Sequence, residues 1–189
     1  MVRGDGSLLV VTRRGVRMTG LPVSAPAAPE PTWWAHDCAC AWTAAWVTVM
    51  LRSRDWKGPR EVLADPELKG KLFWNTRLKL RSAGHRPDLT VGGARGLIPI
   101  EVELQRKDTS RTEGILVMYR GWITEGKIRG VAYVCGNDAL AGRIDELVQG
   151  VGIPKEARRI ELFDDVRHQA LQRAGEPEPA QAASVAREP

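Results

Sequence analysis

The stretch from Leu97 to Cys135 constrains the fold of this chain more than any other. It holds a strand-like segment with alternating side chains (LIPIEVEL, 97–104), a helix-like segment with an apolar stripe (109–124) and an apolar segment typical of a buried strand (VAYVC, 131–135). Two strands that are joined by a helix lie parallel in one sheet, with a right-handed connection. We therefore expect an α/β domain with parallel pairing across this crossover helix.

The segments on either side of this unit extend the predicted sheet and cover it. The glycine-rich turn at 92–96 predicts that the strands before and after it form an antiparallel hairpin. The whole order predicts a mixed β-sheet flanked by helices, antiparallel at first and parallel after the crossover helix. The further elements expected are helices at 33–54, 59–64 and 139–148, a short strand or turn near Trp56, and strands at 73–81, 87–91 and 159–163.

Composition divides the chain into four parts. We expect a β-hairpin at 1–22, a Pro/Ala linker at 23–32, the main domain at 33–172 and a disordered tail at 173–189. No apolar run approaches the roughly 20 residues that a membrane span needs. The arginine pair at 13–14 interrupts the N-terminus where a signal peptide would need an apolar block. We therefore expect a cytoplasmic protein with no membrane partner.

Charge and cysteine content limit the classes of function. Lys and Arg outnumber Asp and Glu by 28 to 23, a net charge of +5 that is compatible with nucleic-acid binding. The three cysteines include no CxxC pair, and Cys38 and Cys40 lie two apart in a predicted helix, so that they point to different faces. A structural zinc site is therefore not expected, and all three are predicted to be buried free thiols.

The acidic residues around the hairpin are the strongest indication of chemistry. Glu101, Glu103 and Gln105 alternate along one strand and so share a face, and the hairpin places Asp88 beside Glu101. Carboxylates gathered in this way repel one another unless a cation compensates them. Mg²⁺ or Mn²⁺ suits such a site and would polarise a phosphodiester. The alternative is an amphipathic strand whose carboxylates face solvent.

Pro87-Asp88 followed by Glu101-x-Glu103 resembles the PD-(D/E)xK nuclease superfamily, in which a Pro-Asp and an acid-x-Lys motif lie on neighbouring strands. The resemblance implies a restriction-endonuclease-like core, with Asp88, Glu101 and Glu103 as metal ligands and catalytic residues. Glu103 stands where that family usually has lysine. Lys107 could supply the missing positive charge from farther along the strand. Alternatively, Glu103 and Gln105 are the working pair and Glu101 is auxiliary.

A narrower resemblance runs from Leu8 to Cys135. The opening VVTRRGVRMTGLP looks like the wing of a winged helix, and WKGPREVL, HRPDL and EVELQRK look like segments of the replication-relaxation family of Gram-positive mobile elements. The resemblance implies that the N-terminal hairpin is a remnant of a winged-helix domain and that the chain is a fragment or a degenerate relative. It also implies that Glu61 is an additional acid near the metal. The alternative is an ordinary glutamate on the helix surface.

Basic residues and one histidine adjoin the acidic cluster. Arg106, Lys107, Arg111 and Arg120 surround the start and outer face of the crossover helix, where they could bind DNA phosphates or form an ordinary solvated face. His85 precedes the Pro-Asp pair and could approach a phosphate or the outer shell of the metal. Otherwise it is a residue at a strand edge.

These features favour a Mg²⁺- or Mn²⁺-dependent endonuclease or nickase that acts on DNA, from a mobile element or phage. We expect a homodimer if both strands of a duplex are cut. One alternative is a non-catalytic DNA-binding replication or relaxation protein with a vestigial nuclease site. The other is a protein-interaction module with no role in nucleic-acid binding.

Overall fold

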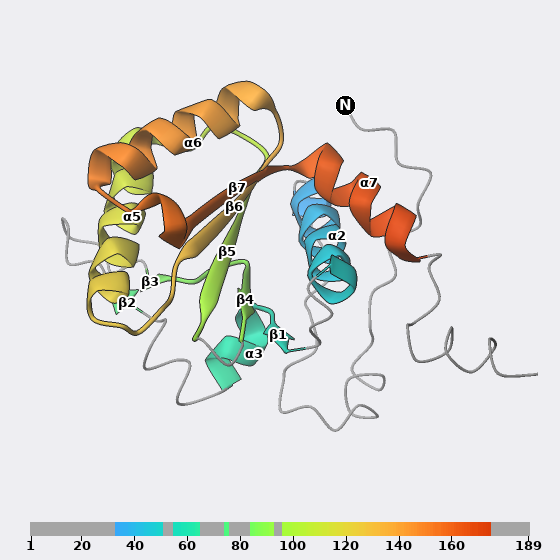
Figure 1. The fold of residues 1–189 in the computed structure, drawn as a ribbon, viewed down its shortest axis with the longest axis horizontal. Coiled ribbons are helices and arrows are strands. Elements are labelled where there is room, and N and C mark those ends of the chain that lie inside the picture. The colour runs from blue at the N-terminus through green and yellow to red at the C-terminus, as the bar shows by residue number, and fades with distance from the viewer. Residues whose placement is uncertain (1–32, 51–54, 65–73, 76–83, 93–95, 175–189) are drawn as a thin grey trace, which may run out of the picture.

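A computed structural model describes residues 33–50, 55–64, 74–75, 84–92 and 96–174 of the chain (Figure 1). The predicted N-terminal hairpin and Pro/Ala linker lie outside the described residues, as do most of the predicted strand at 73–81 and the tail from residue 175.

The centre of the described part is a mixed five-stranded sheet in the order β1-β4-β5-β6-β7. Its first three strands pair antiparallel, and β6 pairs parallel with both β5 and β7. The change of direction follows the connections, because a short glycine-containing turn joins β4 to β5 whereas a long helix joins β5 to β6. The predicted mixed sheet is confirmed. The strands are β1 (Trp56–Lys57), β4 (Leu89–Val91), β5 (Ile98–Glu103), β6 (Val131–Cys135) and β7 (Arg158–Leu162).

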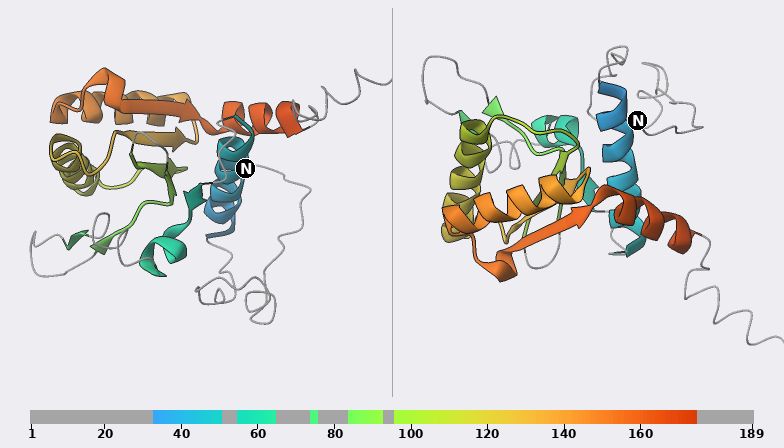
Figure 2. Two further views of the ribbon diagram at one scale, coloured as in Figure 1. Left: turned by 60° about the horizontal axis from the view of Figure 1, so that its bottom comes forward. Right: turned by 90° about the horizontal axis from the view of Figure 1, so that it is seen from above.

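Helices cover both faces of this sheet (Figures 1 and 2). Helices α2 (Trp34–Met50) and α7 (Phe163–Ala174) pack on one face, and α5 (Thr109–Thr124) and α6 (Asp138–Val151) pack on the other. The strands alternate accordingly: Val102 and Val134 face α2 and α7, while Tyr133 faces α5 and α6. The short helix α3 (Pro59–Ala64) adds Val62 to the core on the α5 side.

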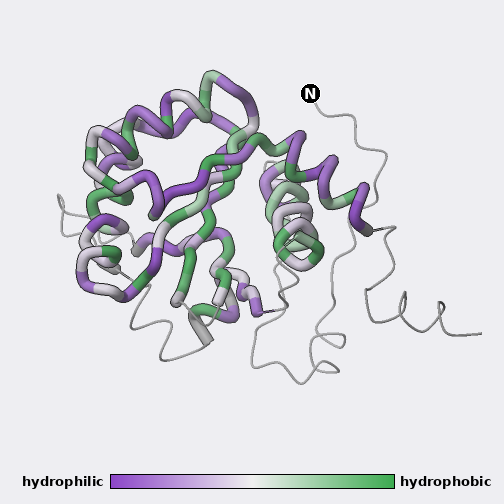
Figure 3. Tube along the Cα trace, viewed as in Figure 1, coloured by the Kyte–Doolittle hydropathy of each residue, from purple (hydrophilic) through white to green (hydrophobic). Residues whose placement is uncertain are grey.

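Helix α2 contacts the sheet through small side chains. Ala39, Thr43 and Val47 recur every fourth residue and are fully buried, which lets α2 lie close to the sheet and to α7. The Trp46 Nε1 donates a hydrogen bond of 2.9 Å to the Gln169 Oε1 and so ties α2 to α7. Figure 3 shows the corresponding pattern along the chain, with hydrophobic residues in the central strands and hydrophilic ones on the outer turns of the helices.

Polar caps set the start of the two helices on the other face. Asp108 caps α5 by accepting a hydrogen bond of 2.9 Å from the backbone N–H of Arg111, and Asn137 caps α6 in the same way through Leu140. The Asp108 carboxylate thus satisfies one of the N–H groups that the first turn of α5 leaves free.

Two elements differ from the prediction. Phe163, expected as the last residue of the final strand, begins α7 instead, and Asp164 and Asp165 lie in the first turn, where acids are favoured. A separate two-stranded sheet, β2 (Trp74–Asn75) with β3 (Gly84–His85), lies beside the main sheet rather than in it. Among the described residues, no helix is both long and apolar enough to cross a membrane.

We expect two glycines to respond in opposite ways to alanine. A Cβ at Gly130, just before β6, would overlap the backbone carbonyl of Ala157, so Gly130→Ala should destabilise the fold by about 1–3 kcal/mol. A Cβ at Gly114 in α5 meets no atom within 4 Å, so Gly114→Ala should stabilise by about 1 kcal/mol through helix propensity. Urea unfolding measures both changes, and a shift of the same sign in both variants would contradict this packing.

Candidate functional site

The candidate site lies at one end of the sheet, where β4 begins and β5 and β6 end. Antiparallel pairing sets Leu89 opposite Ile100, so that Asp88, one residue before β4, comes level with Glu101. Parallel pairing sets Glu103, the last residue of β5, beside Cys135, the last residue of β6. The N-terminus of α5 follows β5 closely and lies at the same end.

Asp88 is fixed where its chain leaves the sheet. Its Oδ2 accepts a hydrogen bond of 2.8 Å from the backbone N–H of Val102, a donor that β4 is too short to satisfy. The same oxygen lies 3.4 Å from the Nε2 of His36, which α2 supplies. The hydrogen bond with Asp88 raises the pKa of His36 above its usual value. The Asp88 side chain stays 18% exposed, so solvent reaches it.

Glu101 is buried beneath α5, with 2% of its surface exposed. Its Oε1 lies 2.7 Å from the Nε2 of His85 and also accepts a hydrogen bond from the Tyr119 hydroxyl. His85 comes from β3, and its ring meets the Tyr119 ring edge to face at 5.9 Å. A buried carboxylate is costly without such partners. The small β2–β3 sheet therefore supplies the histidine side chain that contacts Glu101.

Glu103 and Lys107 form an ion pair at the end of β5. The Lys107 Nζ lies 2.6 Å from the Glu103 Oε1, although the strand has already ended and a bend at 104–105 carries the chain away. Burial raises the pKa of Glu103, and the neighbouring Lys107 opposes that shift. A carboxylate row that faced solvent would be exposed, yet Glu103 is only 5% exposed. Gln105 lies beyond the strand and is exposed.

Each of the three predicted metal ligands has its own partner in this structure. Among the described residues, the His, Cys, Asp and Glu side chains whose ligand atoms all lie within 4.8 Å of one another are His36, Cys40 and Asp88. Asp88, Glu101 and Glu103 share one end of the sheet without converging to that degree. The described contacts of these carboxylates each engage one oxygen, Oδ2 of Asp88 and Oε1 of Glu101 and of Glu103.

The remaining predicted residues are not among the described partners of the three carboxylates. The Glu61 Oε2 accepts a hydrogen bond of 2.7 Å from the backbone N–H of Gly58 and so caps α3. Arg106, Arg111 and Arg120 are exposed. Arg111 and Arg120 are about 13 Å apart along the axis of α5, given its rise per residue, so the basic residues do not gather at one point.

Sequence reasoning missed four residues of this region: His36, Cys40, Tyr119 and Arg143. The spacing His36-x-x-x-Cys40 on a predicted helix is a signal that could have pointed to the first two, because residues four apart share a helix face. Arg143 in α6 donates hydrogen bonds to the Thr109 hydroxyl and, at 3.4 Å, to the Lys107 carbonyl. Only tertiary packing brings it there. Cys38 is exposed and Cys40 is partly buried, so the prediction that all three thiols are buried is correct for Cys135 alone.

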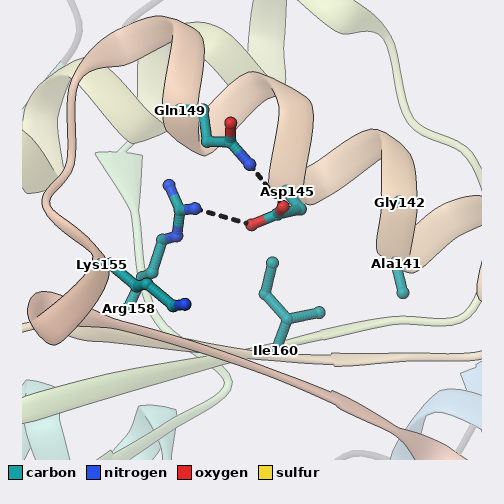
Figure 4. A pocket seen from close by; sticks show the side chains of 7 residues that line it. All are labelled: Ala141, Gly142, Asp145, Gln149, Lys155, Arg158 and Ile160. Atoms are coloured by element: carbon teal, nitrogen blue, oxygen red, sulfur yellow. Dashed lines mark hydrogen bonds and ion pairs between the residues drawn. The ribbon is translucent and has the colours of Figure 1, made fainter.

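A separate hollow lies between α6 and β7, close to the start of β7 (Figure 4). Asp145 of α6 lines this hollow. Its Oδ1 lies 3.2 Å from an Arg158 Nη2, and its Oδ2 accepts a hydrogen bond of 2.5 Å from the Gln149 amide. The Asp145 carboxylate thus has partners on both of its oxygens, and we assign no chemistry to this hollow.

Comparisons of the chain with protein-family models, with curated proteins and with solved structures found no match.

We expect the hydroxyl of Tyr119 to stabilise the fold through Glu101. Tyr119→Phe removes one donor from a buried carboxylate and should cost about 1.5–3 kcal/mol of unfolding free energy. In a Glu101→Gln background the same change should cost roughly 1 kcal/mol, because the acceptor is then uncharged. Tyr133→Phe, which leaves the Tyr119 hydroxyl in place, is the control. Equal costs of Tyr119→Phe in both backgrounds, measured by urea unfolding, would show that the two side chains are not coupled.

Proposed function

We propose that this protein is a divalent-metal-dependent endonuclease or nickase that acts on DNA, with a restriction-endonuclease-like core. The observation that carries the proposal is the gathering of Asp88, Glu101, Glu103 and Lys107 at one end of the sheet, with both glutamates buried. Burying carboxylates at the end of a strand is costly. A site that binds a cation supplies a reason for it.

The order of elements supports the proposed core. The antiparallel strands β1, β4 and β5 of the main sheet come from the chain between α2 and the crossover helix α5, and the parallel strand β6 follows α5. This resembles the helix, strands, helix and strand of the PD-(D/E)xK core, with α3 and the β2–β3 pair inserted between β1 and β4. Glu101 and Glu103 lie on β5, and Asp88 lies one residue before β4, the neighbouring strand.

The carboxylates fit a hard cation. Mg²⁺ prefers oxygen ligands, and the carboxylates of Asp88 and Glu101 would hold it, with Glu103 as a further ligand or as the group that orients a water molecule. Bound Mg²⁺ would polarise the phosphodiester. Lys107 would serve as the positive charge near the reacting phosphate, with its partner Glu103 fixing its position. His85 would hold Glu101 in place from the opposite side.

The cations around the start of α5 support binding to a phosphate backbone. Arg106 and Arg111 are exposed next to Lys107, and Arg143 is fixed by the start of α5. The free N–H groups of a helix N-terminus add to their positive potential. Contacts of this kind position a nucleic acid without reading its bases.

The second candidate function is that of a non-catalytic DNA-binding protein with a vestigial site. The ion pair of Glu103 with Lys107 and the contacts of Asp88 with His36 and of Glu101 with His85 favour it, because they give each acid a partner without a metal. Metal-dependent cleavage separates the two functions.

We expect the protein to nick supercoiled plasmid in the presence of Mg²⁺ or Mn²⁺ and not in the presence of a chelator. Asp88→Asn and Glu103→Gln should each lower the rate at least a hundredfold, the order found when an electrostatic group that acts in the transition state is removed. Glu113→Gln, on the exposed side of α5, is the matched control. Gel analysis measures the rate. Equal nicking by wild type and Asp88→Asn would remove the enzymatic claim.

DNA affinity tests the phosphate contacts separately from cleavage. Arg106→Ala and Arg111→Ala should weaken binding uniformly across DNA sequences and lower the slope of log K against log salt by about 1 each. Lys127→Ala is the control, since Lys127 lies past the far end of α5 in an ion pair with Glu125. Fluorescence anisotropy measures the affinity. A chain that serves only as a protein-interaction module would show no salt-dependent DNA binding.

A further inference from the structure

Three side chains of different chemistry meet beside the first turns of α2. His36 and Cys40 lie one helical turn apart on α2, and Asp88 approaches them from the start of β4. One ligand atom of each lies within 4.8 Å of those of the other two. None of the three is fully buried, so that an ion could enter from solvent.

The three side chains lie close together, and the two shortest distances among them involve different nitrogens of the His36 ring. The Cys40 Sγ lies 3.6 Å from the His36 Nδ1, and the His36 Nε2 lies 3.4 Å from the Asp88 Oδ2. Zinc bonds of about 2.0 Å to nitrogen and 2.3 Å to sulfur place neighbouring ligands roughly 3.4–3.7 Å apart. A rotation of the His36 ring would present one nitrogen to an ion that Cys40 and Asp88 also reach.

The donor types select the class of metal. A thiolate and an imidazole favour Zn²⁺ and similar ions over Mg²⁺ or Ca²⁺, which prefer oxygen. The charges also balance, because one thiolate and one carboxylate neutralise a divalent ion while the imidazole stays neutral. A neutral assembly suits a half-buried position.

The surroundings hold the ligands in place. The Val102 N–H fixes Asp88 through Oδ2, and the ring of Trp33 meets the His36 ring edge to face at 6.1 Å. Supporting contacts of this kind orient ligands and raise metal affinity. Cys38, two residues before Cys40, is exposed and lies outside the group.

We propose that His36, Cys40 and Asp88 form a binding site for a transition-metal ion of the Zn²⁺ class, with the fourth position left to water or to another ligand. This site differs from the proposed magnesium site in its donor atoms and in two of its three residues. Asp88 is common to both, and it is the residue through which an ion in one site would affect the other.

Titration of the full chain with Co²⁺, which stands in for Zn²⁺, tests the site under reducing conditions. We expect one ion per chain with a thiolate-to-cobalt charge-transfer absorption band, and displacement of that band by Zn²⁺. Cys40→Ser should abolish the band, and His36→Gln should lower the affinity at least tenfold, as loss of even a supporting contact does at metal sites. Cys38→Ser is the matched control and should keep both the band and the affinity.

Several outcomes would overturn the proposal: absence of a thiolate band in the wild type, a band that survives Cys40→Ser, or equal loss of the band in Cys38→Ser. Far-ultraviolet circular dichroism of each variant shows whether it is folded, and His36→Gln, which alters a residue near the start of α2, provides the second test if Cys40→Ser unfolds. Failure of the nuclease proposal leaves the band unchanged, and absence of the band leaves Mg²⁺-dependent nicking unchanged.

Discussion

The burial of Glu101 beneath α5 is the constraint on which the rest of the site depends. A carboxylate with 2% exposure needs partners, and His85 and Tyr119 supply them from two separate elements. Meeting that need fixes the small β2–β3 sheet against the main sheet and fixes the rotation of α5. The position of α5 then sets that of Lys107 and Asp108, which follow β5 and precede the helix. The contacts of this one buried side chain therefore link β3, β5 and α5.

The topology explains why the polar residues gather at one end of the sheet. An antiparallel hairpin places the start of β4 at the end of β5, and a crossover helix brings β6 back parallel, so that its end lies there too. Strand β4 is too short to pair with all of β5, and the Val102 N–H that remains is satisfied by Asp88. The side chain thus takes the place of the missing strand at this N–H, and the same oxygen lies 3.4 Å from His36 of α2.

Much of this fold could be predicted from local patterns. The structure agrees with the predicted bounds of α3, α5 and β6, since each has a periodicity or composition that its neighbours lack. Helix α7 could not be predicted from its pattern, because it is short and polar and its helical form depends on packing against α2. The candidate site could likewise be predicted only in part. Alternation along β5 placed Glu101 and Glu103 on one face, but contacts across the fold, such as His85 with Glu101, have no local signal.

Asp88 links the two proposed sites, which lie toward opposite helical layers. Toward α2 it meets a nitrogen and a sulfur donor, whereas on the α5 side the neighbouring groups are the carboxylates of Glu101 and Glu103. The α2 side therefore suits a soft ion and the α5 side a hard one. Because the Val102 N–H already holds one oxygen of Asp88, its carboxylate has little freedom to serve two ions at once. The metal ion bound to Asp88 would then determine whether the side chains of α2 or the glutamates on the α5 side take part in the chemistry of this protein.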